Sequence, residues 1–216
     1  CLEALNSYDS AFLSFGPIQQ TVGVGAERGE LQGALAHVKI VRLDLFNRFF
    51  GRFKLDVVDV AKVQKVDKGY FQLEGKKLAT AADKEVLRDF LWSYRCVKAM
   101  RTPEFREPFL DLGFGRIDVV KGLTAKIGGD EVTLGDVYKM EASLALLLDA
   151  HINLPALVDS PNGIWVQAAK TAMGLVAGAK LDTSKVKDDD EYKMIKEIVK
   201  LRNTSAMWSP SSRAAF

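Results

Sequence analysis

The residue types with the clearest chemical potential lie near the start of the chain. Glu3 is followed by a polar loop and then by the run SFGPIQQT, which begins at Ser14. A carboxyl group held against apolar side chains has its charged form disfavoured, so its pKa rises and it stays protonated near neutral pH. Glu3 is therefore a candidate proton donor. The nearby apolar residues that could form such a wall are Leu2, Leu5, Phe12, Leu13 and Phe15.

The segment 3–30 resembles the lysozyme superfamily, and within it the lytic transglycosylases, goose-type lysozymes and related phage endolysins. Their shared signature is a catalytic Glu at the end of a helix, followed later by a Gly, two mostly apolar residues and a Gln. Residues 16–19 (GPIQ) match the second part, and Gln19 follows Glu3 by sixteen positions, close to the family's usual separation. A later segment, residues 146–155 (LLLDAHINLP), is similar to a core helix of some peptidoglycan-cleaving endolysins.

The resemblance implies an enzyme that cleaves the glycan strand of peptidoglycan, with Glu3 as the general acid. Breaking a glycosidic bond requires a proton at the leaving oxygen while positive charge develops on the sugar ring. Gly16 would let the backbone approach the sugar closely, and Gln19 would bond an N-acetyl or hydroxyl group. Thr21 would position a water, although an ordinary strand threonine explains it as well. The expected substrate-binding residues are Ser14, Gly16, Gln19 and Thr21.

A second carboxylate would decide the mechanism. Inverting glycosidases hold the pair roughly 6.5 to 9.5 Å apart with a water between them, and retaining enzymes hold it at about 5 Å. Asp9 is the first choice, although a turn or capping role suits it equally well. Glu27 and Glu30 fit the first turn of the following helix, where the dipole favours negative charge. Lytic transglycosylases manage with one Glu, so hydrolase and transglycosylase both stay open.

The hydrophobic pattern predicts a mostly helical α+β fold, lysozyme-like, with a small β element over residues 54–80. Apolar residues recur at intervals of three and four over 27–50, which predicts an amphipathic helix that Gly51 ends. Residues 54–80 read as short strands around a turn at Asp67, Lys68 and Gly69. We expect one catalytic domain over residues 1–216, without the helix that would precede Glu3. Further helices are predicted over residues 82–101, 103–112, 116–127, 133–151, 160–179 and 191–201.

Composition limits the classes of partner. Hydrophobic residues make up 48% of the 216, enough for a sizeable core, and 30 Lys and Arg against 28 Asp and Glu give a net charge of only +2. The spread of charge argues against nucleic acid, while the mildly basic balance suits an anionic polymer such as a cell wall. No apolar stretch is long enough to cross a membrane, so no membrane insertion is expected. Cys1 and Cys96 are too few for a disulfide framework, and whether they pair stays open.

No metal or organic cofactor motif is present, which fits a cut catalysed by acid alone. Two alternatives remain: a chitosanase-like glycosidase on a related scaffold, or a non-catalytic module that holds a glycan or a partner protein. A generic helical interaction domain would leave the polar SFGPIQQT run without a purpose. The expected location is the bacterial cell wall, reached by secretion or by phage delivery, with a delivery or immunity protein as an open partner. The source and the oligomeric state are not determined by the sequence.

Overall fold

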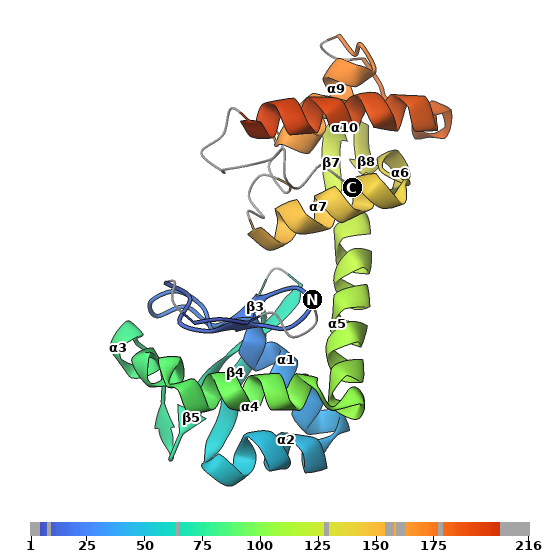
Figure 1. Ribbon diagram of the computed structural model, residues 1–216. Helices are drawn as coiled ribbons and strands as arrows, with labels where there is room; N and C mark the ends of the chain where they lie inside the picture. Colours follow the sequence, from blue (N-terminus) through green and yellow to red (C-terminus); the bar gives the residue numbers. More distant parts are fainter. Residues whose placement is uncertain are drawn as a thin grey trace. The chain divides into compact units, whose positions relative to one another are not determined.

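The computed structural model describes residues 5–7, 10–63, 65–127, 130–153, 158, 163–176 and 179–203. Within these residues helices predominate, and the strands form small antiparallel sheets (Figure 1). The predicted fold class, a mostly helical α+β protein, is confirmed. None of the described helices is long and apolar enough to span a bilayer.

The chain divides into two compact units, Cys1–Gly115 and Arg116–Phe216. The boundary falls within helix α5 (Pro103–Lys121). Each unit has its own cluster of buried apolar side chains. We expected one catalytic domain over residues 1–216; that both units serve one catalytic domain stays a prediction.

The first unit combines two small sheets with a set of helices. The β4-β5 hairpin packs against α1, and the β1-β2-β3 sheet carries the SFGPIQQT run. The elements before α5 are β1 (Leu5–Asn6), β2 (Ser14–Phe15), β3 (Gln20–Thr21), α1 (Glu30–Val41), α2 (Leu43–Phe49), η1 (Gly51–Phe53), β4 (Leu55–Val63), β5 (Val66–Leu73), β6 (Lys76–Lys77), α3 (Ala81–Lys84), η2 (Glu85–Arg88) and α4 (Phe90–Met100).

The β element predicted over 54–80 is present, but its turn is not where the Asp-Lys-Gly sequence indicated. The chain reverses where Val63 pairs with Val66, and residues 67–69 lie inside β5. Gly69 serves close packing instead: it forms a two-way backbone bridge with Gly29, with N–O distances of 2.9 and 3.0 Å. A Cβ on Gly33 of α1 would lie 1.9 Å from the carbonyl oxygen of Asp67, so these glycines let the helix approach the strand.

The helix predicted over 27–50 is two helices. Gly29 is extended because it pairs with β5, so α1 begins only at Glu30. Arg42, with φ −142° and ψ 63°, interrupts the helical backbone and separates α1 from α2. The N–H of Arg42 still donates to Val38 O at 2.7 Å, which closes the last turn of α1. Helix α2 ends at Phe49, two residues before the predicted stop at Gly51, and Gly51 begins a short 3-10 helix.

Aromatic side chains form the centre of the first core. Phe15 of β2 meets Phe109 of α5 edge to face at 5.8 Å, and Phe109 stacks on Phe105 at 5.5 Å. All three rings are fully buried. Cys96 of α4 is a free thiol in this core, and burial raises its pKa to about 12. The thiol therefore stays protonated and serves packing.

The second unit is built on its own hydrophobic core. After α5 its elements are β7 (Thr124–Ile127), β8 (Asp130–Thr133), α6 (Leu134–Val137), α7 (Glu141–Asn153), α9 (Ile164–Ala172), η3 (Thr183–Lys185) and α10 (Asp188–Asn203). Helix over 116–127 was wrong in part: α5 ends at Lys121, and β7 follows with Ala125 and Ile127 buried and Thr124 and Lys126 exposed. Alternation of buried and exposed residues is a strand pattern. Over only four residues, it could not be told from a helical pattern in the sequence.

One buried carboxylate in the second unit accepts three hydrogen bonds. Glu191 of α10 is 1% exposed, and its Oε2 accepts hydrogen bonds from Lys139 N and Met140 N at 2.9 Å and from Ser143 Oγ at 2.7 Å. These donors surround the start of α7, whose first N–H groups have no partner within the helix. Glu191 thus caps α7 from a different helix. The described part of the LLLDAHINLP segment lies in α7, where Leu147 and Ala150 are buried.

Candidate functional site

The β1-β2-β3 sheet contains the strand that follows Glu3 in the sequence and the two strands on either side of residues 16–19. Leu5 pairs with Phe15 and Asn6 with Ser14, while Phe15 pairs with Gln20 and Ser14 with Thr21. The strand that begins two residues after Glu3 is therefore the direct neighbour of the strand that leads into residues 16–19. Glu3 and Asp9 themselves lie outside the described residues.

Residues 16–19 form the tight turn between β2 and β3. The N–H of Gln19 donates to the carbonyl oxygen of Gly16 at 3.1 Å. Gly16 has φ +92° and Gln19 has φ +52°, so both backbones are left-handed. Glycine adopts this conformation without strain, whereas Gln19 holds it at a cost that the sheet must offset. We call these four residues the Gly16 turn.

Gly16 also makes room for two neighbouring side chains. A Cβ at this position would lie 2.6 Å from Gln20 Oε1 and 3.1 Å from the ring of Phe109. Both distances are shorter than an ordinary carbon contact, so a side chain at Gly16 would displace one of them. The structure thus gives the glycine a packing reason that is independent of any ligand.

The predicted substrate-binding residues are brought together, but they differ in accessibility. Ser14 is only 4% exposed, so its side chain faces the protein interior. Gln19 and Thr21 are half-buried, as are Pro17 and Ile18 between the two strands. Gly16 is also buried, so the surface that a ligand could reach is formed by residues 17–19 and Thr21 and not by Ser14 or Gly16.

Gln20 is a site residue that the sequence did not single out. It is 3% exposed, and no described residue donates to its buried Oε1. It stands next to the motif glutamine, and only the strand register shows that Gln20 turns inward. Its buried side-chain amide packs against Gly16 on the inner side of the turn.

The other two candidate carboxylates occupy different environments. Glu30 begins α1, as expected from helix polarity, and forms an ion pair with Lys68 at 3.5 Å. Glu27 precedes the helix and its side chain is exposed. The expectation of a first-turn position is confirmed for Glu30 and wrong for Glu27, because Gly29 is held in a β-bridge.

A buried lysine holds the loop that follows the sheet. Lys84, at the end of α3, is fully buried, and its Nζ donates to Gly23 O at 2.9 Å and to Glu27 O at 2.7 Å. Desolvation by burial lowers the pKa of Lys84, and the nearby Glu27 charge opposes that shift. The ammonium donates its hydrogen bonds to backbone carbonyls, so Lys84 holds residues 23–27 in place.

Three further side chains donate to backbone carbonyls on either side of the Gly16 turn. Arg88 of η2 donates to Ser7 O at 2.5 Å, Tyr70 Oη donates to Ala26 O at 3.0 Å, and Gln32 Nε2 donates to Val22 O at 3.1 Å. These donors come from η2, β5 and α1. The backbone on both sides of the Gly16 turn is therefore held by elements distant in sequence, a signal that no local pattern carries.

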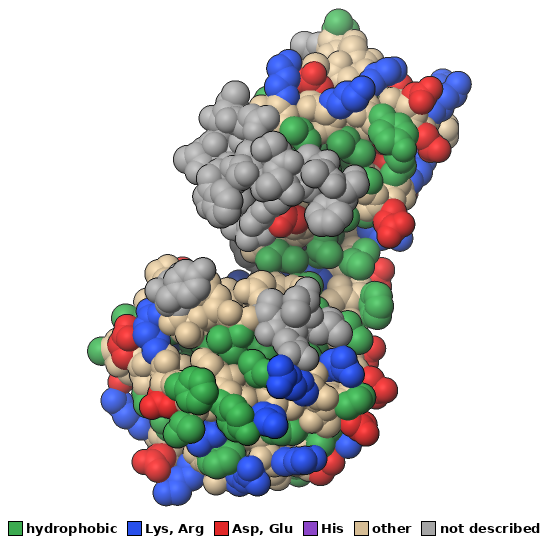
Figure 2. Space-filling model, in the orientation of Figure 1, with side chains coloured by type: hydrophobic (Ala, Val, Ile, Leu, Met, Phe, Trp, Pro, Cys, Tyr) green, Lys and Arg blue, Asp and Glu red, His purple; other side chains and the backbone are tan. Residues whose placement is uncertain are grey.

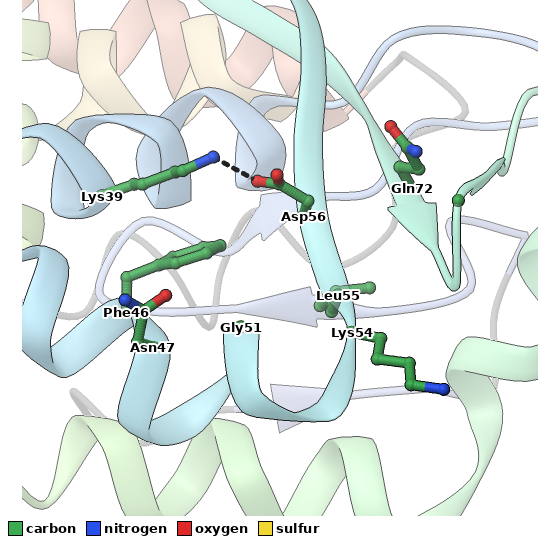
Figure 3. A pocket seen from close by; sticks show the side chains of 9 residues that line it. Lys39, Phe46, Asn47, Gly51, Lys54, Leu55, Asp56 and Gln72 are labelled. Atoms are coloured by element: carbon green, nitrogen blue, oxygen red, sulfur yellow. Dashed lines mark hydrogen bonds and ion pairs between the residues drawn. The ribbon is translucent and has the colours of Figure 1, made fainter.

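A separate cavity of about 310 Å³ lies in the first unit, at the other end of α1 (Figure 3). Lys39 and Asp56 form an ion pair across it at 2.5 Å. Lys39 follows Gln32 by seven residues, roughly 10 Å along the helix. None of the sequence-predicted site residues contributes to its lining, which is formed by Lys39, Phe46, Asn47, Gly51, Lys54, Leu55, Asp56, Gln72 and Gly75.

Comparisons of the chain with protein-family models, with curated proteins and with solved structures find no significant match. The resemblance to the lysozyme superfamily therefore rests on the sequence alone, chiefly on the residues of segment 3–30. Among the described residues, no three His, Cys, Asp or Glu side chains gather in a way that could hold a metal ion.

Proposed function

We propose that this protein cleaves the glycan strands of peptidoglycan at the bacterial cell wall, with Glu3 as the general acid. One observation carries the proposal. The pairing of Leu5 with Phe15 puts the strand that follows Glu3 beside the strand that leads into the Gly16 turn. The proposal takes Glu3 and the Gly16 turn, which are distant in sequence, as parts of one site.

Covalent geometry supports the same assignment. Glu3 precedes Leu5 by two residues, and two extended residues span at most roughly 7 Å. The proposal therefore takes Glu3 to lie near the start of β1, beside the strand that leads into the Gly16 turn. Phe12, Leu13 and Phe15 are all buried in the same unit, and the proposal takes them as the apolar surroundings of the acid. Such surroundings disfavour a charged carboxylate and would keep Glu3 protonated for delivery to the glycosidic oxygen.

The Gly16 turn would bind the sugar. Gln19 would donate to and accept from N-acetyl and hydroxyl groups, and Thr21 would hold a water or a hydroxyl group. Asp9 is proposed as the second carboxylate, since Glu30 is paired with Lys68. If Asp9 is not required, the substrate's own N-acetyl and hydroxyl groups complete the reaction, as in the transglycosylases that the segment resembles.

The decisive experiment measures release of soluble fragments from purified peptidoglycan. Glu3→Gln should lower turnover at least about 100-fold, because it removes the acidic proton while keeping the size of the side chain. Glu27→Gln is the matched control and should keep wild-type turnover, because the Glu27 side chain is exposed. Circular dichroism would check that both variants fold. Wild-type turnover in Glu3→Gln would refute Glu3 as the acid.

Mass spectrometry of the fragments separates the remaining routes. Anhydro ends indicate a transglycosylase, and reducing ends indicate a hydrolase in which Asp9→Asn should also lower turnover. If fragments are released from chitosan but not from peptidoglycan, the substrate is chitosan and the proposed substrate is wrong. A wild-type protein that leaves the muropeptide profile unchanged but still binds the glycan would be a binding module and not an enzyme.

A further inference from the structure

The outward side of α4 carries large apolar side chains where polar ones are usual. Phe90 is 75% exposed, Leu91 52% and Tyr94 49%. The Phe90 and Tyr94 rings are neighbours one helical turn apart, with centroids 6.3 Å apart and planes inclined by 30°. Lys98 lies one turn further along the same side and is also exposed. We call Phe90, Leu91, Tyr94 and Lys98 the α4 face.

Packing of α4 into the core does not account for these residues. The buried side of the helix consists of Trp92, Cys96, Ala99 and Met100. A helix needs only one apolar stripe to hold its place in a domain. Three large apolar side chains gathered on the opposite side form an exposed patch of the kind that marks a binding surface.

The charges on helix α4 itself are positive, and the exposed Asp89 caps the helix directly before Phe90. Helix α4 contains no acidic residue, and its charged side chains are Arg95 and Lys98. Lys98 Nζ lies 5.6 Å from the centre of the Tyr94 ring, and the Arg95 guanidinium stacks between Phe53 at 3.7 Å and Trp92 at 4.3 Å. Neither cation forms an ion pair with a described residue. Figure 2 shows hydrophobic side chains interspersed with Lys and Arg over this part of the first unit.

We propose that the α4 face is a second binding surface for a glycan that carries carboxylate groups, the class of polymer to which the proposed substrate belongs. The apolar face of a sugar ring packs against Phe90 and Tyr94, and Lys98 and Arg95 meet the carboxylates. An aromatic platform with flanking cations matches both properties of such a polymer. The proposal rests on the proposed function for the identity of the glycan, but it concerns retention of the polymer and not its cleavage.

The test is co-sedimentation of the 216-residue chain with insoluble peptidoglycan. The double variant Phe90→Ser/Tyr94→Ser should bind at least about tenfold more weakly than wild type, because both stacking surfaces are lost. Lys98→Glu should weaken binding and reduce its dependence on salt. Phe114→Ser, which removes a ring that is 65% exposed on α5, is the matched control and should bind like wild type. Melting temperatures check that each variant is folded.

The two proposals fail in different ways. Glu3→Gln should abolish cleavage and still sediment with the polymer, and cleavage of short soluble glycan fragments should be unchanged in the double variant. Retained sedimentation of the double variant, or absence of sedimentation in the wild type, overturns the binding surface whatever happens to cleavage. Vesicles of anionic lipid are the parallel probe: if the double variant loses vesicle binding and keeps peptidoglycan binding, the α4 face binds a membrane surface and the proposal is overturned.

Discussion

Gly16 illustrates how one residue can satisfy two requirements at once. Its φ of +92° excludes most side chains, and its missing Cβ leaves space for Gln20 and Phe109. In the resemblance, the glycine lets a sugar approach the backbone. The structure adds that Gly16 packs closely against Gln20 and Phe109, so the glycine has a packing role besides its proposed role in binding sugar.

Gly16→Ala should therefore destabilise the protein by about 2 to 4 kcal/mol, from left-handed strain together with overpacking. Urea unfolding measures the change in the free energy of unfolding. Gly25→Ala is the control, because Gly25 has φ +54° but nothing within 4 Å of its added Cβ. Gly25→Ala should lower the free energy of unfolding by about 1 kcal/mol, from backbone strain alone. Equal losses at the two positions would contradict the packing argument.

At the scale of elements, α3 and η2 act on the candidate site without contributing to the Gly16 turn. Thr80 and Asp83 form a reciprocal capping box that starts α3, and Lys76 pairs with Asp83 at 2.6 Å. The hydrogen bonds from Lys76 and Thr80 hold the pKa of Asp83 below its usual value. Because the cap fixes where α3 begins, it also fixes the position of Lys84 at the end of this short helix. A local capping box thus helps to place the contact of Lys84 with Gly23 and Glu27.

Lys84→Met should release residues 23–27, because Gly23 O and Glu27 O would lose their shared donor. The expected loss in the free energy of unfolding is about 2 to 4 kcal/mol, since two buried acceptors lose a charged donor. Hydrogen exchange read by mass spectrometry should show faster exchange in residues 22–29. Lys62→Met, at an exposed position of β4, is the control and should change neither quantity. Unchanged exchange in Lys84→Met would mean that the loop is held by its other contacts.

At the scale of the whole molecule, the two units differ in what organises them. The first core is aromatic and centred on Phe15, Phe105 and Phe109, whereas the second contains the Tyr138 and Trp165 pair, with rings 5.0 Å apart. Tyr138 Oη donates to Trp165 O at 2.6 Å, and burial raises the pKa of Tyr138 far above its usual value. No buried residue belongs to both clusters. Each unit should therefore respond to changes in its own core.

Glu191→Ala tests that independence. It removes the acceptor for two N–H groups and a hydroxyl group, and should cost roughly 2 to 4 kcal/mol in the second unit. Hydrogen exchange should accelerate in α7 and α10 and stay unchanged in α1 and β5. Glu197→Ala on the same helix should have a much smaller effect, because the Glu197 side chain is partly exposed and forms a surface ion pair with Lys200. Equal acceleration in both units would show that they unfold together.

Much of the architecture follows from local pattern. The spacing of apolar residues predicted most helices and the β element over 54–80, because an element that buries one side must repeat its apolar residues with its own period. Segment 3–30 was singled out by its resemblance to the lysozyme superfamily and not by periodicity. Glu3 and Asp9 were chosen on sequence alone, and their roles stay predictions.

Tertiary contacts decided the rest. By composition, residues 67–69 are a turn signal, yet they lie in a strand. Gly69 pairs with Gly29, and Asp67 packs against Gly33 of α1, so contacts with the α1 region hold this run extended. Lys84 finds its carbonyl partners 61 and 57 positions away, and Gln20 is buried only because β3 pairs with β2. Local periodicity carries information over a few residues, whereas these outcomes depend on which distant segment fills the space beside each one.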